Sequence, residues 1–100
     1  MTTVELYNAI VEKRGQFCEM CGARVGTELH HCLYHRRKGA SFYDVPENLE
    51  LLCKQCHSTG FVNSWKHRVE FWIKQCSVYG SEHMENWNNN LPIKIKHKFV

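Results

Sequence analysis

The chain has 100 residues, of which 43% are hydrophobic and 12% aromatic, and its formal net charge is +3. This length supports one hydrophobic core rather than two, so we expect a single domain over residues 1–100. No stretch approaches the roughly 18 apolar residues of a membrane span. Residues 1–15 lack the apolar core of a signal peptide, which predicts a cytoplasmic protein with no membrane partner. The modest positive charge suits a polyanionic partner without requiring one.

Residues 2–14 predict a helix that serves as a scaffold. Thr2 and Glu5 have the spacing of a capping box, and Gly15 follows the last helical residue. The expected apolar stripe of this helix consists of Val4, Tyr7, Ile10 and Val11.

Two Cys-x-x-Cys pairs predict a structural zinc site. The turn between two such cysteines aims both thiolates at one ion, and a second pair completes a closed tetrahedral shell. The four ligands would be Cys18, Cys21, Cys53 and Cys56. A redox dithiol is the alternative, but it requires a βαβ setting that this chain lacks. Cys32 and Cys76 fall outside the pairs and are expected to be small buried residues.

Residues 27–34 have the composition of a strand and contain two adjacent histidines, His30 and His31. Neighbouring residues of a regular strand point to opposite faces of the sheet. Either one histidine faces a metal ion while the other faces a substrate, or a bend brings both to the rim of one site.

A basic loop follows this strand and contains His35, Arg36, Arg37 and Lys38. Its position beside the histidines favours a phosphate-binding role over a solvated turn, because guanidinium groups match phosphate oxygens. A turn over residues 45–48 then leads into a second short strand, residues 49–52.

The C-terminal part predicts a helix, a loop and a strand. Apolar residues recur at helical spacing from residue 63 to Gly80, namely Trp65, Val69, Trp72, Ile73 and Cys76. The asparagine-rich residues 81–90 predict a loop. Residues 92–100 alternate and predict an edge strand, with Lys94, Lys96 and Lys98 on one side and Ile93, Ile95, His97 and Phe99 on the other.

The order of the two cysteine pairs, His30-His31, Asn48 and His57 resembles the HNH endonuclease family in its zinc-stapled phage or bacterial form. The resemblance covers about residues 15–60 and leaves a helix and a basic tail over residues 63–100. It implies an α+β fold: a small ββα-metal domain with a structural four-cysteine zinc site and flanking N- and C-terminal helices.

The resemblance also implies a role for each residue of the motif. His30 and His57 would bind one catalytic divalent ion, and His31 would be the general base. Asn48 would tie the loop between the strands so that the base is held in position. Some relatives carry a third histidine ligand at the position of Phe61, which cannot bind a metal, so His35 and His67 remain open as third ligands.

We therefore expect a metal-dependent DNA endonuclease that hydrolyses phosphodiester bonds in double-stranded DNA. Imidazole suits the removal of a proton from water near neutral pH, and a divalent ion neutralises charge on the phosphate. The expected ion is Mg²⁺ or Mn²⁺, although imidazole ligands also accept Ni²⁺ or Zn²⁺. The alternative is a non-catalytic, zinc-stapled nucleic-acid-binding module, which would need neither His31 nor Asn48.

Overall fold

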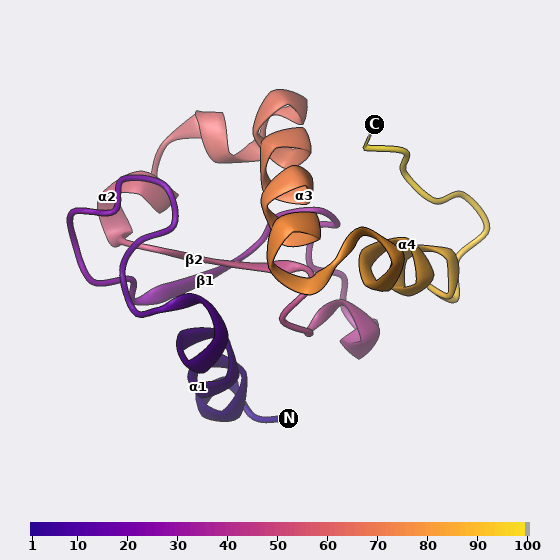
Figure 1. Ribbon diagram of the computed structural model, residues 1–100, viewed down its shortest axis with the longest axis horizontal. Helices are drawn as coiled ribbons and strands as arrows, with labels where there is room; N and C mark the ends of the chain where they lie inside the picture. The colour runs from indigo at the N-terminus through magenta and orange to yellow at the C-terminus, as the bar shows by residue number, and fades with distance from the viewer. Residues whose placement is uncertain (100) are drawn as a thin grey trace.

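The computed structural model describes residues 1–99 and has a two-stranded antiparallel sheet at its centre (Figure 1). The strands are β1 (Glu28–His31) and β2 (Leu49–Leu52), and the helices are α1 (Thr3–Arg14), α2 (Lys54–His57), α3 (Trp65–Tyr79) and α4 (Ser81–Asn89). Two short 3₁₀ turns, η1 (Ser41–Tyr43) and η2 (Gly60–Asn63), complete the regular structure. The predicted α+β class and the flanking helices are thus confirmed. No helix in residues 1–99 is long and apolar enough to cross a membrane.

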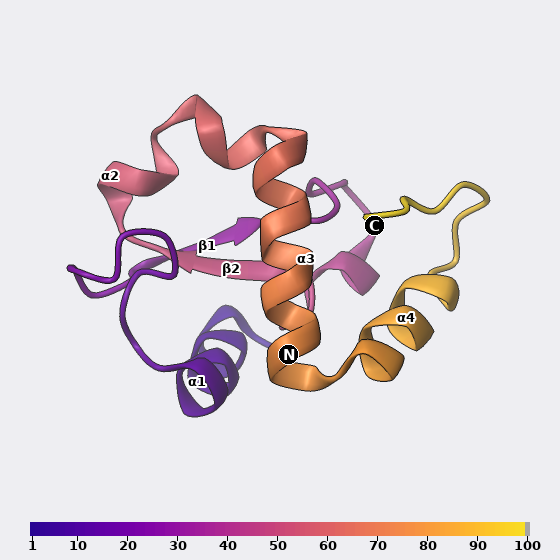
Figure 2. The same cartoon turned by 45° about the horizontal axis from the view of Figure 1, so that its top comes forward.

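The two faces of the sheet are covered by different helices. Leu49 and Leu51 pack against Leu6 and Ile10 of α1. On the opposite face, Glu50 bonds to His67 of α3, which crosses the strands in Figure 2. Strand alternation produces this division, because successive side chains point to opposite faces.

α1 begins as predicted, with both hydrogen bonds of the capping box between Thr2 and Glu5. Its predicted apolar stripe is only partly correct. Val4 is 68% exposed, whereas Leu6 is buried against the sheet together with Ile10. The stripe is therefore centred on Leu6 and Ile10, at the four-residue spacing that keeps two side chains on one helix face.

α3 has nearly the predicted bounds but a different buried face. Trp65 and Ile73, both expected in the core, are about half exposed. The buried face contains His67, Phe71, Trp72 and Gln75. Two of these are polar, and each has a hydrogen-bond partner: His67 bonds to the buried Glu50, and Gln75 donates to the carbonyl oxygens of Pro46 and Glu47. Apolar periodicity misses a helix face of this kind.

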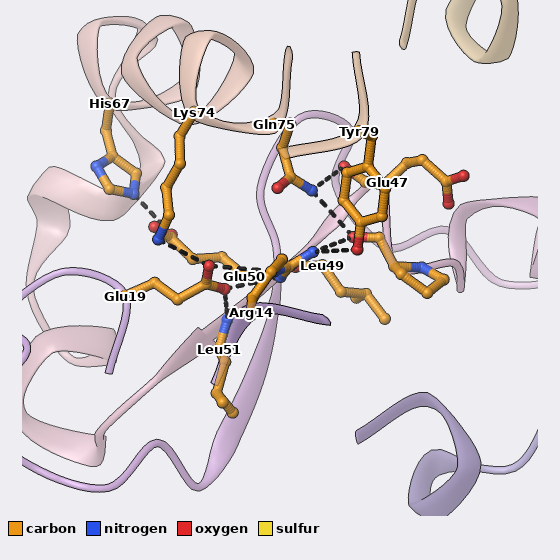
Figure 3. Close-up of polar contacts among 11 residues, drawn as sticks. Arg14, Glu19, Glu47, Leu49, Glu50, Leu51, His67, Lys74, Gln75 and Tyr79 are labelled. Atoms are coloured by element: carbon orange, nitrogen blue, oxygen red, sulfur yellow. Dashed lines mark hydrogen bonds and ion pairs between the residues drawn. The ribbon is translucent and has the colours of Figure 1, made fainter. Parts of the chain in front are cut away.

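A buried ion pair joins the first cysteine loop to three other elements (Figure 3). Arg14 contacts the Glu19 carboxylate at 2.7 Å and donates to the Pro46 carbonyl oxygen at 2.8 Å. Glu19 also accepts hydrogen bonds from Leu51 N and Lys74 Nζ. Burial opposes ionisation of Glu19, but these partners outweigh it and lower the pKa of the carboxyl. The network fixes the cysteine loop against α1, β2 and α3.

The predicted structure of the last twenty residues is wrong. Residues 81–89 form helix α4 rather than a loop, because Met84 and Asn88 share one buried face of that helix. Within residues 92–99 no strand is formed, and Val100 lies outside the described residues. Phe99 and Ile93 pack on the aromatic cluster around Tyr34 and Trp72, while Ile95 is 83% exposed. Packing of single aromatic side chains, rather than strand pairing, places this tail.

Candidate active site

The four paired cysteines converge on one point. The sulfur atoms of Cys18, Cys21, Cys53 and Cys56 all lie within 4.8 Å of one another. Those of Cys21 and Cys53 are 3.9 Å apart. A tetrahedral zinc site with Zn–S bonds of about 2.3 Å requires sulfur–sulfur distances of about 3.8 Å. The cluster therefore fits a closed zinc site without rearrangement of the chain.

The surroundings of the cluster favour the thiolate form of Cys21 and Cys53. Hydrogen bonds from the backbone of Ala23 and Arg24 lower the pKa of Cys21 to about 6, and a bond from the Cys56 amide lowers the pKa of Cys53. The Arg24 guanidinium lies 3.8 Å and 3.9 Å from the sulfurs of Cys21 and Cys53. Burial, followed by the bonds to neighbouring thiols, raises the pKa of Cys56 to about 12. A bound cation would offset the effect of burial on Cys56, because it stabilises all four thiolates.

The histidines of the motif line a single open depression of about 320 Å³. His30 and His31 come from β1, and His57 is the last residue of α2. The ring centroids of His30 and His57 are 5.1 Å apart. The other lining residues are Leu29, His35, Arg36 and Asn63. His31 also borders a second groove beside α1. The end of β1 therefore brings both histidines to one rim although their side chains leave opposite faces of the strand.

Each of these three histidines has one ring nitrogen held by an oxygen acceptor. His30 Nε2 contacts the Val62 carbonyl at 3.0 Å, His31 Nε2 contacts Asp44 at 2.7 Å, and His57 Nδ1 contacts Glu28 at 2.6 Å. Carbonyl and carboxylate oxygens only accept, so each of these nitrogens donates. The second nitrogen of each ring has no hydrogen-bond partner within residues 1–99 and is available to accept a proton or bind a metal.

His30 is also kept neutral by its surroundings. Burial lowers the pKa of its ring to about 4, and the neighbouring histidines act in the same direction. A neutral imidazole is the form that binds metal ions. His30 thus has the protonation state of a ligand before any ion is bound.

Asn48 holds the loop between β1 and β2 in place through three side-chain hydrogen bonds. Its side chain is fully buried, accepts from Tyr34 N at 2.8 Å, and donates to the carbonyl oxygens of Tyr34 and Tyr43 at 2.9 Å and 3.0 Å. Tyr43 directly precedes Asp44, the partner of His31. The arrangement is that of a loop clamp, and its role in positioning the base stays a prediction.

Replacing Asn48 with alanine should lower the free energy of unfolding by about 2–5 kcal/mol, because buried backbone groups lose their partners. Denaturant unfolding of the zinc-loaded protein measures this change. The matched control is Asn89→Ala at an exposed position of α4, expected within about 0.5 kcal/mol of wild type. Equal stability of the two variants would show that the three hydrogen bonds contribute little.

The basic loop is divided between two surfaces. His35 and Arg36 line the histidine depression, whereas Arg37 and Lys38 line a neighbouring concavity that also includes Arg36 and Asp44. The two surfaces are therefore continuous through Arg36. His35 and His67 were both left open as a third ligand of the catalytic ion. His35 lines the depression, whereas His67 is bonded to Glu50 and does not line it.

His30 belongs to a second group of metal-ligating atoms, with Cys32 and Glu50, on the face of the sheet toward α3. Burial raises the pKa of the Cys32 thiol well above its usual range, and Glu50 is already paired with His67 at 2.7 Å (Figure 3). The Glu50 hydrogen bond in turn raises the pKa of His67. We interpret Cys32, Glu50 and His67 as a hydrogen-bonded part of the core, beside which His30 faces the depression.

Sequence reasoning missed Glu28, Asp44 and Asn63. Glu28 had a usable signal, because it lies two residues before His30 and so on the same side of the strand. Asp44 and Asn63 lie in short 3₁₀ or turn segments, and nothing in their local sequence connects them with the histidines.

A two-stranded hairpin followed by a short helix, with histidines at the strand end and on the helix, defines a ββα-metal domain. Residues 18–60 match the model of the HNH endonuclease family. The chain is also similar to Zorya protein ZorE of Escherichia coli (strain Crooks), with 36% identity over 53 residues. That match covers 53% of this chain and 14% of ZorE. No solved structure matches the chain significantly.

Proposed function

We propose that this protein is a metal-dependent endonuclease that hydrolyses phosphodiester bonds in double-stranded DNA. One observation carries the proposal: three histidines line one depression. In each of them one ring nitrogen donates to an oxygen atom, and the other ring nitrogen has no hydrogen-bond partner within residues 1–99. Core histidines satisfied by packing would not be expected to share an open depression with Arg36.

His31 is the general base in this proposal. With Nε2 donating to Asp44, its Nδ1 can take a proton from the attacking water. Asp44 fixes the orientation of the ring and stabilises the imidazolium that forms, as an acidic partner does in other catalytic histidine pairs. Asn48 supports this pair through the loop that carries Asp44.

His30 and His57 would hold the divalent ion. When bound, that ion supplies positive charge for the phosphate and the leaving oxygen. The Glu28 carboxylate orients His57 so that Nε2 is its ligand atom. Imidazole ligands accept Mn²⁺, Ni²⁺ or Zn²⁺ as well as Mg²⁺.

The remaining predicted residues have binding and structural roles. The four cysteines would hold a zinc ion with a full shell, which leaves no position for chemistry. His35, Arg36, Arg37 and Lys38 would bind phosphates of the DNA backbone from the two continuous surfaces.

Incubation of the purified protein with supercoiled plasmid tests the proposal. We expect conversion to nicked or linear DNA with Mg²⁺ or Mn²⁺ and none when the ion is chelated. DNA binding without cutting, with any of the four ions, would identify the non-catalytic nucleic-acid-binding module instead.

A further inference from the structure

Arg68 lies on α3, beyond the segment that matches the family, yet it contacts a residue that lines the histidine depression. Its guanidinium Nη2 donates to His35 Nε2, and His35 lines the depression together with His30 and His31. The contact joins α3 to the basic loop and places a positive charge at the edge of the depression.

The hydrogen-bonding capacity of Arg68 is largely unused. A guanidinium has five N–H donors. The Nε donor of Arg68 is buried without a partner, and no carboxylate within residues 1–99 forms an ion pair with it. Arg14, the buried arginine of α1, is different: it bonds to Glu19 and to two backbone carbonyl oxygens. Arg14 is satisfied by the fold, and Arg68 is not.

An anion bound at the rim of the depression would give Arg68 a hydrogen-bond acceptor and a charge partner. Arg68 Nη1 has no hydrogen-bond partner within residues 1–99 and, unlike the buried Nε, is open to solvent, so an oxygen of that anion could accept from it. The planar guanidinium matches two oxygens of a phosphate group better than any other side chain. Burial, and then the charge of Arg68, lowers the pKa of His35, which keeps that ring neutral as an acceptor for Arg68.

We propose that Arg68 binds a phosphate of the DNA backbone adjacent to the bond that is cut, with His35 holding its guanidinium at the rim of the depression. This inference rests on the proposed function. It adds to the binding surface a residue from α3, so that phosphate contacts come from both the basic loop and the third helix. The group that Arg68 would bind is thus a phosphodiester.

Binding of a short DNA duplex by Arg68→Gln tests the inference, in a His31→Ala background so that the DNA stays intact. Glutamine can still donate to His35 but carries no charge. We expect affinity to fall about tenfold or more, and the slope of log affinity against log salt concentration to decrease by about one. The control is Lys66→Gln, an exposed cation two residues away on α3, for which neither quantity should change appreciably.

An unchanged affinity and slope in Arg68→Gln would overturn the inference and leave Arg68 as a tether for the basic loop. Zinc content and unfolding midpoint verify that the variant is folded. If it is not, Arg68→Lys replaces it, with a duplex in which one phosphate at the cut site is a neutral methylphosphonate. In the His31→Ala background, protein with Arg68 intact should then lose the advantage over Arg68→Lys that it shows on ordinary DNA; a retained advantage contradicts the inference. These readouts report binding, so absence of cleavage by the wild type would end the proposed function without deciding this one.

Discussion

Replacing His31 with alanine is expected to lower the rate of DNA cleavage by a factor of about 10² to 10⁴ while DNA affinity stays nearly unchanged. The rate falls because the nitrogen that takes the proton is lost. Affinity is maintained because the basic loop and the proposed ligands His30 and His57 are untouched. Single-turnover cleavage, measured beside duplex binding and zinc content, gives the three quantities.

Asp44→Asn is the matched comparison for His31→Ala. Asparagine keeps the size of Asp44 but removes the carboxylate that bonds His31 Nε2. We expect an intermediate loss of rate, because the base is present but its imidazolium is less well stabilised. Added imidazole should partly restore His31→Ala, and excess metal ion should not. Cleavage by His31→Ala at the wild-type rate would remove the proposed mechanism.

Cys53→Ser should abolish stoichiometric zinc and cooperative unfolding. Zinc binding to four-ligand peptides is worth about 10–16 kcal/mol, comparable to or greater than the total stability of an ordinary domain. Cys53 is buried with Cys18, Leu52 and Val62, so this small cluster depends on the ligand directly. Metal analysis and thermal unfolding followed by circular dichroism measure both effects.

Cys76→Ser is the control, because Cys76 lies on α3 away from the four converging sulfurs. It should keep one equivalent of zinc and a cooperative transition. The same behaviour in Cys53→Ser would contradict the four-cysteine assignment.

Local signals explain which parts of the fold could be predicted. The capping box of α1, the cysteine pairs and the residues of β2 are each defined by a few neighbouring positions, and the structure confirms all three. α4 was missed because its polar face contains most of its asparagines, whereas its packing depends on Met84, Trp87 and Asn88. Asn88 bonds to Tyr34, a partner 54 positions away that no local pattern reveals.

The candidate site shows the same limit. The motif order predicted which histidines would meet, and all three line one depression. It did not predict what holds them, because those contacts join distant positions: Val62 with His30, Asp44 with His31, and Glu28 with His57. The groups that orient a catalytic side chain are set by tertiary packing and leave little trace in a single sequence.

Plasmid cleavage measured against Mn²⁺ concentration, for wild type, His57→Ala and His31→Ala, tests the division of roles most directly. His57→Ala loses a proposed ligand, so half-maximal cleavage should require a higher ion concentration, with partial recovery at excess ion. His31→Ala should keep the wild-type midpoint at a much lower rate. An unchanged midpoint in His57→Ala, or a shifted one in His31→Ala, would contradict the assignment of ligand and base.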